Sequence, residues 1–430
     1  MKSNIITKSI HEKYVNIILD SLEDLDMNNL FKKAFEKHNV FEKINEKENI
    51  YIISIGKVSI NMYYALNNLI PDKITNSITI SVENMYEMSN NYKSSHPNPS
   101  LDSYKCSVKL IEFLSSINLT ENDIVIFAIS GGTSAMLMAP TPFFSLEEVL
   151  NINDKLLNCG HDVSTINKVR KAISKLHGGG ILTYLKNVEV YSFILCDNVQ
   201  KDLSSVGSGL TFNYDVKEKD LYKVLNDIEL SKEQISKVLQ SHYYKIEKQS
   251  EFKKTNITNI LLADTQQSLF SLSDRIKTNG YEVIILTDTL QGEAKEVAKV
   301  LGSIYRYLAE KFNKKFSIIC SGEVTVTIQG NGKGGRCQEL AWCVAKEIED
   351  MKGESTFISF ATDGNDYINN VAGAWVNNRT MGEIKKKNIS WEDTLNNNNT
   401  YNGLNQLGQL ITNINTNTNL CDLYVFFKDS

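Results

Sequence analysis

The sequence lacks the cysteine spacing of a zinc site or of a disulfide framework. Its seven cysteines are odd in number and form no C-x-x-C pair, which argues against both kinds of site. The histidines other than His96 show no metal-ligand spacing either. We therefore expect a reduced protein without a zinc centre.

Long hydrophobic runs and a dominant charge are also missing. No segment approaches about 18 consecutive apolar residues, and the first residues lack the apolar core and the cleavage site of a signal peptide. The net charge of −5 and the pI near 5.8 leave no general basic surface for nucleic acid. We expect a cytoplasmic protein that binds neither membrane nor nucleic acid, so any anion site must be local.

The length and the order of elements predict the fold class. A chain of 430 residues is too long for one ordinary core, so we expect two domains. Apolar strands alternate with helical stretches, which predicts an α/β fold with mainly parallel sheets. A segment rich in Lys and Ser near residues 243–258 sets the expected domains at 1–245 and 255–430. The expected strands are 50–55, 78–82, 123–129, 188–195, 257–262, 283–286, 316–319 and 357–360.

A glycine-rich run, residues 329–336, stands between a strand-like and a helix-like stretch. Its four glycines let backbone N–H groups approach an anion, and the helix start adds a favourable dipole. Arg336 could then bind phosphate oxygens in a bidentate way. The alternative is a flexible hairpin tip with an exposed arginine.

Polar residues follow the strands of the first half, where open α/β sheets place ligands. Lys57 closes one strand, where its charge could bind an anion; an exposed surface lysine is the alternative. Ser130-Gly131-Gly132-Thr133 offers hydroxyl and N–H groups. We favour phosphate or carboxylate binding there over a serine nucleophile, because the run is not G-x-S-x-G.

Further along, an amide and an arginine precede two carboxylates. Asn167 and Arg170 lie on an expected helix and could hold a substrate carboxylate, although a solvated basic face would look the same. Asp197 ends a strand and Asp202 follows, which suits Mg²⁺ ligation or hydroxyl activation. Capping is the strong alternative for Asp202, and turn formation competes for Asp363 in the second half.

These segments form an ordered series of motifs that covers nearly the whole chain. They are Gly56-Lys57, His96-Pro97-Asn98-Pro99, Ser130-Gly131-Gly132-Thr133-Ser134-Ala135, Asn167-Lys168-Val169-Arg170, Ser321-Gly322-Glu323-Val324-Thr325-Val326, Gly334-Gly335-Arg336-Cys337-Gln338-Glu339 and Thr362-Asp363-Gly364-Asn365-Asp366. The series resembles the class II glycerate 2-kinases, a family with a C-terminal MOFRL domain.

The resemblance implies a fold and an activity. The fold is a Rossmann-like parallel-sheet domain followed by an α/β MOFRL-type domain, with the active site in the cleft between them. The activity is phosphoryl transfer from ATP, with Mg²⁺, to the 2-hydroxyl of D-glycerate, giving 2-phospho-D-glycerate. Such chemistry needs positioning and charge neutralisation more than covalent steps. The expected partners are the small acceptor and ATP, and a homodimer stays open.

The resemblance also implies roles for single residues. Lys57 and Arg336 would neutralise the transferring phosphoryl group, and Asp197 would ligate Mg²⁺ or activate the hydroxyl. The implied binding residues are His96, Ser130, Gly131, Gly132, Thr133, Asn167, Arg170, Asp202, Glu323, Gly334, Gly335 and Asp363.

The chain departs from the family's pattern around the implied cleft. The family's S-D-V-x-G-D…S-G-P-T run corresponds to residues 196–202 and 208–211, which keep both aspartates but lose Ser, Gly and Pro. Cys337 stands where Asn is expected. Two alternatives therefore stay open: a kinase of another small hydroxy acid, or a catalytically silent homologue that binds a nucleotide or sugar acid. An NAD-dependent reductase is disfavoured, because no G-x-G-x-x-G follows an early strand.

Overall fold

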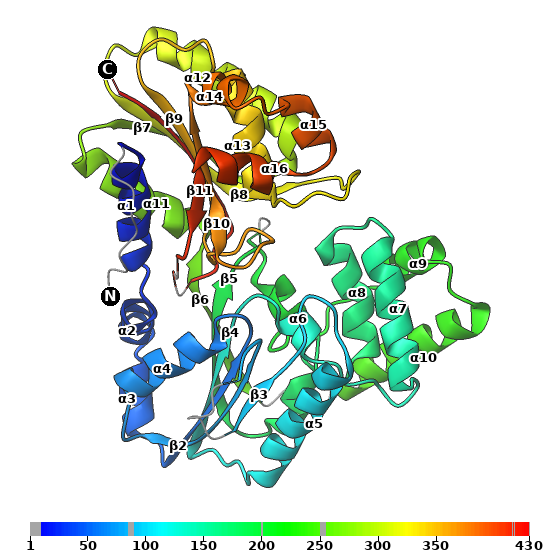
Figure 1. The fold of residues 1–430 in the computed structure, drawn as a ribbon. Helices are drawn as coiled ribbons and strands as arrows, with labels where there is room; N and C mark the ends of the chain where they lie inside the picture. The colour runs from blue at the N-terminus through cyan, green and yellow to red at the C-terminus, as the bar shows by residue number, and fades with distance from the viewer. Residues whose placement is uncertain are drawn as a thin grey trace. The chain divides into compact units, whose positions relative to one another are not determined.

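The structure is a computed structural model that describes residues 10–84, 90–198, 201–249, 255–414, 416 and 418–429. The chain forms two compact units (Figure 1). One unit is Met27–Ala263, and the other combines Met1–Asp26 with Asp264–Ser430. Each unit contains one six-stranded sheet.

These units differ from the expected domains 1–245 and 255–430 at two places. Helix α1 (Ile10–Glu23) belongs with the later unit, because it packs on α11 (Thr265–Thr278) and its Tyr14 stacks on Phe427 at 4.2 Å. Strand β6 (Asn256–Asp264) extends the first sheet beside β5. The boundary therefore follows the sheet pairing rather than the Lys- and Ser-rich composition.

The first sheet has the strand order β3-β2-β1-β4-β5-β6, and the pairings described from β3 to β5 are all parallel. Its inner strands β4 and β5 are buried along almost their whole length, as expected for strands covered on both faces. The expected strands of the first half are confirmed, and β3 is an addition. The strand bounds are β1 (Asn49–Ile55), β2 (Ile74–Ser81), β3 (Asn91–Lys93), β4 (Asp123–Ile129) and β5 (Glu189–Cys196).

Helices cover both faces of this sheet. On one face, Phe31 and Phe35 of α2 pack on Phe193 of β5, with ring centroids 5.3 and 5.2 Å away. On the other face, α5 contributes Leu110 and Leu114 to a core with Phe127. The helix bounds are α2 (Met27–Lys37), α3 (Val40–Asn45), α4 (Ser59–Leu69), α5 (Leu101–Ser116) and α6 (Thr133–Met136).

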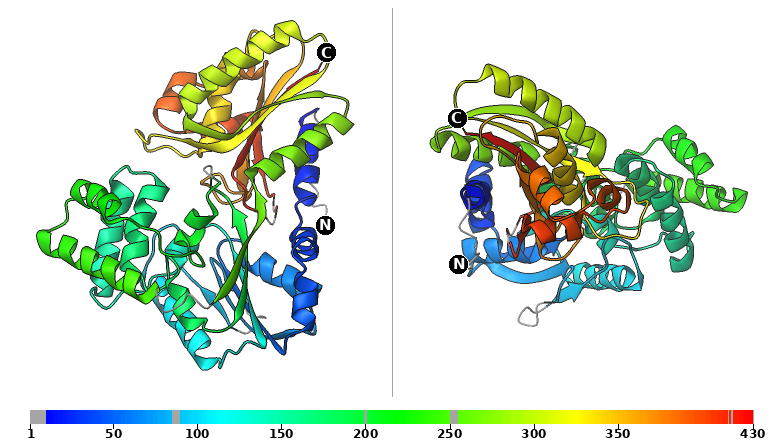
Figure 2. Two further views of the ribbon diagram at one scale, coloured as in Figure 1. Left: turned by 180° about the vertical axis from the view of Figure 1, so that it is seen from behind. Right: turned by 45° about the horizontal axis from the view of Figure 1, so that its top comes forward.

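Four further helices of this unit, α7 to α10, form a group with a core of their own (Figures 1 and 2). Helix α7 begins with a capping box made by Ser145 and Glu148, and Asp162 caps α8. The bounds are α7 (Leu146–Asn158), α8 (Val163–Ile173), α9 (Glu218–Asp227) and α10 (Lys232–Gln249), with the short 3₁₀ helices η1 (Gly180–Tyr184) and η2 (Leu203–Ser208) beside them.

The second sheet corrects the expectation of mainly parallel strands. Its order is β11-β10-β9-β12-β8-β7, and only β7 and β8 pair in parallel among the pairings described. Strand β12 lies between β8 and β9 and runs antiparallel to both. The sheet is therefore mixed, because the C-terminal segment enters its centre. The bounds are β7 (Glu282–Glu293), β8 (Phe316–Thr325), β9 (Ser355–Ala361), β10 (Val371–Asn377), β11 (Leu410–Thr412) and β12 (Asp422–Lys428).

Adjacent residues of β12 face opposite layers of the second unit. Phe426 stacks on Tyr305 of α12 at 4.6 Å, whereas Phe427 stacks on Tyr14 of α1. Helices α12 and α13 thus cover one face of the sheet, and α1 covers the other. The remaining bounds are α12 (Ala294–Lys311), α13 (Arg336–Glu347), α14 (Thr380–Lys386), α15 (Trp391–Asn396) and α16 (Thr400–Leu407).

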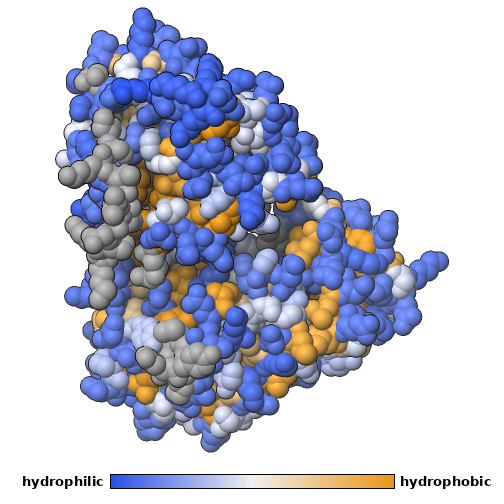
Figure 3. Space-filling model, viewed as in Figure 1, coloured by the Kyte–Doolittle hydropathy of each residue, from blue (hydrophilic) through white to orange (hydrophobic). Residues whose placement is uncertain are grey.

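The visible surface is mainly hydrophilic. Figure 3 shows hydrophobic residues in separate groups among hydrophilic ones. Within the described ranges, no helix combines the length and the apolar character needed to cross a bilayer.

Candidate active site

Strands β1, β4 and β5 end at one edge of the first sheet, and predicted site residues follow each of them. The three strands are parallel neighbours, so their carboxyl ends meet. Lys57 comes shortly after β1, Ser130 directly after β4, and Asp197 directly after β5. The fold therefore brings these three predicted residues to the same edge.

The loops after β1 and β4 are joined by hydrogen bonds. The Lys57 N–H donates to the Gly131 carbonyl at 2.9 Å, and the Val58 N–H donates to Ser130 Oγ at 3.2 Å. A side chain at Gly56, where φ is +127°, would collide with Ser130 Oγ. Glycine at this position is what allows the two loops to approach so closely.

The hydroxyl groups of the second loop are used inside the protein. Ser130 and Thr133 are fully buried. Thr133 Oγ1 lies 2.8 Å from the Ser130 carbonyl and 3.0 Å from the Ile55 carbonyl. These two side chains shape the loop, so a ligand here would meet its backbone.

His96, Gly132 and Lys57 lie together beside this loop. A Cβ atom placed on Gly132, which has φ +88°, would lie 2.9 Å from His96 Cδ2 and 3.2 Å from Lys57 Cγ. Burial, followed by the nearby charge of Lys57, lowers the pKa of His96 to about 4. His96 is therefore neutral at physiological pH and can serve as a hydrogen-bonding group next to a cation.

Asn167 joins three segments. Its Nδ2 donates to the Ser205 carbonyl at 3.1 Å, and its Oδ1 accepts from Ser208 Oγ at 2.9 Å. Ser208 Oγ also lies 2.9 Å from Ser134 Oγ. Asn167 is buried, so it positions the loop that contains η2 against the loop after β4.

Arg170 is a largely buried cation on the same helix. Its Nε donates to Asn153 Oδ1 at 2.9 Å. Within the described residues no carboxylate pairs with it, and burial lowers its pKa to about 10. A buried guanidinium whose described side-chain partner is an amide lacks a countercharge. An anion bound beside it would be strongly stabilised.

The two predicted carboxylates after β5 differ in their bonding. Asp202 Oδ1 accepts from the Ser204 N–H at 2.9 Å and caps η2. Asn198 also holds this turn, because its Oδ1 accepts from the Asp202 N–H at 3.0 Å. Asp197 stands at the strand end and is partly exposed. The capping alternative describes Asp202 well, which leaves Asp197 as the candidate for chemistry.

The described residues contain no group of three or more His, Cys, Asp or Glu side chains that could enclose a metal ion. Mg²⁺ commonly binds through one or two carboxylates together with substrate phosphates and water. Asp197 fits that mode of binding.

In the second unit, Arg336 is held by two carboxylates. Its Nε and Nη2 donate to Asp422 at 2.6 and 2.9 Å, and its Nη1 lies 3.1 Å from Glu323 Oε1. Burial lowers the pKa of Arg336, but the charges of Asp422 and Glu323 outweigh it and raise the pKa. Arg336 is thus a partner in a bidentate ion pair, and only its remaining donors can meet a ligand.

The backbone of the glycine-rich loop before Arg336 is hydrogen-bonded by asparagines. Asn398 Oδ1 accepts from the N–H groups of Gln329 and Gly330 at 2.7 and 3.0 Å. Asn397 Oδ1 accepts from the Asn331 N–H at 3.0 Å. The Asn397 carbonyl accepts from Gly332, and Asn399 Oδ1 from Lys333. The N–H groups that suggested a phosphate nest at 329–333 therefore have protein acceptors.

The start of α13 already contains an anion. Asp366 accepts from the N–H groups of Cys337 and Gln338 at 3.0 and 2.9 Å. Gly335 lies against Asp366, and a side chain there would collide with it. Burial raises the pKa of Asp366 to about 6. The dipole of this helix thus acts on Asp366 rather than on a ligand at that position.

Three further predicted residues of the second unit, Gly334, Asp363 and Glu323, contact other parts of the unit. Gly334 packs against Thr400. Asp363 Oδ1 accepts from the Asn365 N–H at 3.0 Å, which is the turn that the sequence offered as the alternative. Glu323 is exposed apart from its pair with Arg336.

Sequence reasoning did not identify Asp422 or the asparagine acceptors. Asp422 opens the apolar run of β12, where a buried carboxylate needs a cationic partner. The tract 396–400 reads as an exposed loop, although asparagine side chains are effective acceptors for backbone N–H groups. Repeated asparagines opposite a glycine-rich run are the signal that could have identified this contact.

Comparison with known proteins shows the family. The family model "Domain of unknown function (DUF4147)" matches residues 13–242, and the "MOFRL family" model matches residues 316–422. A glycerate 2-kinase of Pyrococcus horikoshii is 29% identical over 87% of this chain and 86% of its own length. A D-glycerate 2-kinase of Thermotoga maritima is 27% identical over 97% of this chain and 98% of its own length.

A solved structure agrees with these sequence matches. The crystal structure of a glycerate kinase from Thermotoga maritima superposes with a TM-score of 0.84 at 27% identity. It covers 98% of this chain and 100% of its own. The chain therefore belongs to the DUF4147 family, the glycerate kinase family with a MOFRL domain.

Proposed function

We propose that the protein transfers a phosphoryl group from ATP to the 2-hydroxyl of D-glycerate, giving 2-phospho-D-glycerate and ADP. The grouping of Lys57, His96 and Gly132 where β1 and β4 end carries the proposal. A lysine beside a glycine and a neutral histidine suits a phosphate, which needs charge and close backbone approach. The glycerate 2-kinases among the protein's relatives support glycerate as the acceptor.

The first unit supplies most of the proposed roles. Lys57 neutralises charge on the transferring phosphoryl group, and His96 donates a hydrogen bond without adding charge. Arg170 binds the substrate carboxylate through its Nη groups, because its Nε is bonded to Asn153. Asn167 holds the loop that contains η2 against the loop after β4.

Arg336 is the second proposed cation in the reaction. Asp422 and Glu323 fix its guanidinium, so only its remaining donors are available to neutralise phosphoryl charge. A fixed cation needs no reorganisation during the reaction, which is the advantage of preorganised charge.

In the transfer step, the 2-hydroxyl oxygen bonds to the γ-phosphorus while the bond to the β–γ bridging oxygen breaks. Asp197 either accepts the hydroxyl proton or ligates Mg²⁺, in which case the proton passes to a phosphoryl oxygen. Bound Mg²⁺ would neutralise phosphate charge.

The experiment is an ADP-release assay with D-glycerate and a panel of small hydroxy acids, with the product identified by ³¹P NMR. We expect turnover with D-glycerate and a 2-phosphate product. Lys57→Met should lower kcat/KM by about 100-fold or more, while Lys105→Met on α5 leaves it unchanged. A 3-phosphate product would refute the assigned position.

Asp197→Asn separates the two roles of that carboxylate. If Asp197 is a ligand, the variant needs a higher Mg²⁺ concentration to reach its half-maximal rate. If Asp197 is the proton acceptor, kcat falls while the required Mg²⁺ concentration stays the same.

The altered segment 196–211 motivates a second candidate, a kinase of another hydroxy acid. Turnover with a different acid of the panel at higher kcat/KM would favour it. Tight ATP binding without turnover of any acid would favour the silent homologue.

A further inference from the structure

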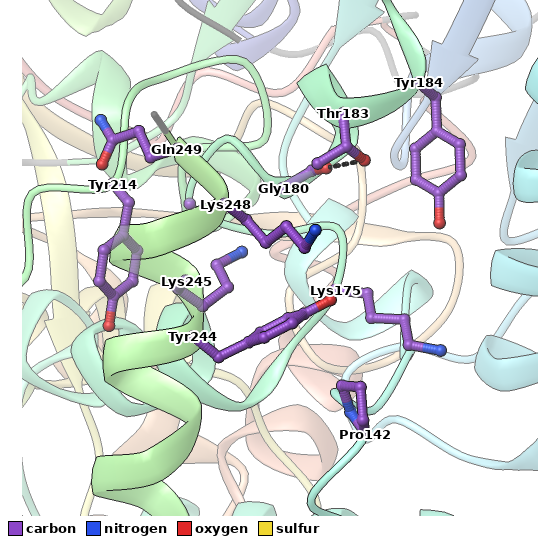
Figure 4. A pocket seen from close by; sticks show the side chains of 11 residues that line it. Pro142, Lys175, Gly180, Thr183, Tyr184, Tyr214, Tyr244, Lys245, Lys248 and Gln249 are labelled. Carbon is purple, nitrogen blue, oxygen red and sulfur yellow. Dashed lines mark hydrogen bonds between the residues drawn. The ribbon is translucent and has the colours of Figure 1, made fainter. Parts of the chain in front are cut away.

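A pocket lies within the first unit, and none of the residues of the candidate active site lines it. It has a volume of about 260 Å³ and is bordered by α10, η1 and the turn that follows α8 (Figure 4). Three lysines and three tyrosines dominate its wall: Lys175, Lys245, Lys248, Tyr184, Tyr214 and Tyr244. We call it the lysine pocket.

The charged side chains that line the lysine pocket are all lysines among the described residues. None of its 11 lining residues is an aspartate or a glutamate. In Figure 4 the amino groups of Lys245 and Lys248 extend toward the space above the Tyr244 ring. Lysine amino groups around a small concave volume favour an anion over a cation.

Lys245 gives the strongest indication of an anion site in the pocket. It is only 4% exposed. Its Nζ donates to the Ser174 and His177 carbonyls at 3.0 and 2.5 Å, and no carboxylate pairs with it in the described parts of the chain. An ammonium group has three donors, so one remains beyond these two bonds. A bound anion would supply both the missing acceptor and the missing countercharge.

The aromatic walls narrow the class of anion. The Lys245 and Lys248 amines lie 5.6 and 6.0 Å from the Tyr214 and Tyr244 ring centroids. The rings and the lysine stems add apolar surface, which favours a ligand with a short carbon part. The volume is below the range of about 300–1,000 Å³ typical of sites for drug-sized ligands, so that part must be small.

We propose that the lysine pocket binds a small phosphate monoester, as a ligand site separate from the site of phosphoryl transfer. Lysine ammonium groups serve as point charges for phosphate oxygens, and the tyrosine rings contact the ester's carbon atoms. This proposal goes beyond the proposed function and does not depend on it.

The site has a structural connection to the candidate active site. The turn that borders the pocket donates from the Gly178 N–H to the Ser208 carbonyl at 2.9 Å, and Ser208 bonds to Asn167. A ligand in the pocket would therefore contact a turn that is hydrogen-bonded to η2.

Isothermal titration calorimetry of the full chain with glycerol 3-phosphate tests the proposal, with malonate and inorganic phosphate as further probes. We expect glycerol 3-phosphate to bind more tightly than either. The double variant Lys175→Met/Lys248→Met should weaken binding at least tenfold, since it removes two of the lysines that would bind phosphate oxygens. Its melting temperature should match that of the wild type, because Lys175 is exposed and Lys248 is only partly buried.

Two controls keep the result specific. Lys105→Met/Lys109→Met removes two exposed lysines from α5 and should bind as the wild type does. Arg170→Met should also retain binding, because it alters the candidate active site and not the pocket. No binding by the wild type, equal binding by the Lys175/Lys248 variant, or loss of binding in either control would overturn the proposal. Malonate binding as tightly as the ester would overturn the phosphate class.

Discussion

Arg170 and Arg336 are both predicted site residues, yet the structure surrounds them differently. Arg170 contacts the Asn153 amide and pairs with no carboxylate within the described residues. Arg336 is fixed by Asp422 and Glu323. Burial lowers the pKa of the first, while neighbouring charges raise the pKa of the second.

The difference teaches that the neighbours of an arginine determine what it can do. A guanidinium without countercharge is poorly stabilised until an anion arrives, so Arg170 suits binding. A guanidinium in a bidentate pair already contributes to the fold, so Arg336 suits stability and positioning.

The largest expected effect tests the structural side of this comparison. Arg336→Met leaves Asp422 buried without its cationic partner and should lower the free energy of unfolding by about 3 kcal/mol. This value is the lower end of the range for a broken buried ion pair, because Arg336 is partly exposed. Urea unfolding followed by circular dichroism measures it. Adding Asp422→Leu should restore much of the loss. A single variant as stable as the wild type would remove the distinction between the two arginines.

Arg170→Met should give the opposite result. We expect kcat/KM for the acceptor to fall by about 10- to 100-fold, as for loss of a charged hydrogen bond of about 1.5–3 kcal/mol. Unfolding should change by about 1 kcal/mol or less, because only the bond to Asn153 is lost from the fold. Arg170→Lys should retain part of the activity. Unchanged kinetics with reduced stability would mean that Arg170 contributes to the fold and not to substrate binding.

Lys245 extends the comparison to a third buried cation. Burial lowers its pKa to about 7, whereas the unfolded chain keeps an ordinary lysine pKa of about 10.4. Between these values the unfolded state holds more protons than the native state, so stability rises with pH, by up to about 1.4 kcal/mol per pH unit. Below the folded pKa both states are protonated, and this contribution is constant.

The measurement is urea unfolding at pH 7, 8 and 9 for the wild type and Lys245→Met. The difference between the two should depend on pH, since shared titrations, such as that of the nearby His177, largely cancel. Lys175→Met, an exposed lysine of the same pocket, should show no such difference. A parallel pH dependence in the wild type and Lys245→Met would mean that Lys245 titrates normally.

The strands of the first sheet and the residues that follow them could be predicted from the sequence, because both depend on short local patterns. Continuous apolar runs predicted β1, β4 and β5, and the polar residues behind them fall at one sheet edge because parallel neighbours share their direction. The position of Lys57 needed no knowledge of distant segments.

The partners of Arg336 could not be predicted in this way. Asp422 lies 86 positions along the chain and enters the sheet through β12, so the ion pair depends on tertiary pairing. The same holds for Asn398, whose side chain binds a loop 68 or more positions earlier. The glycine-rich run does contain N–H groups that bind acceptors, as its sequence indicated. The acceptors are asparagines of the protein and not a bound phosphate.

The smallest expected effect concerns the start of α13, where Asp366 occupies the place expected for a phosphate. Asp366→Asn keeps the size of the side chain but turns one oxygen acceptor into an N–H donor. Because the Cys337 and Gln338 N–H groups both face this side chain, one of them must lose its acceptor. We expect a loss of about 1 kcal/mol in the free energy of unfolding, the usual effect of removing a helix cap. Asp363→Asn, in an exposed turn close by, is the matched control and should change stability by no more than about 0.5 kcal/mol. Equal effects of the two substitutions would show that the helix start does not depend on Asp366, and the loop could then admit an external anion after all.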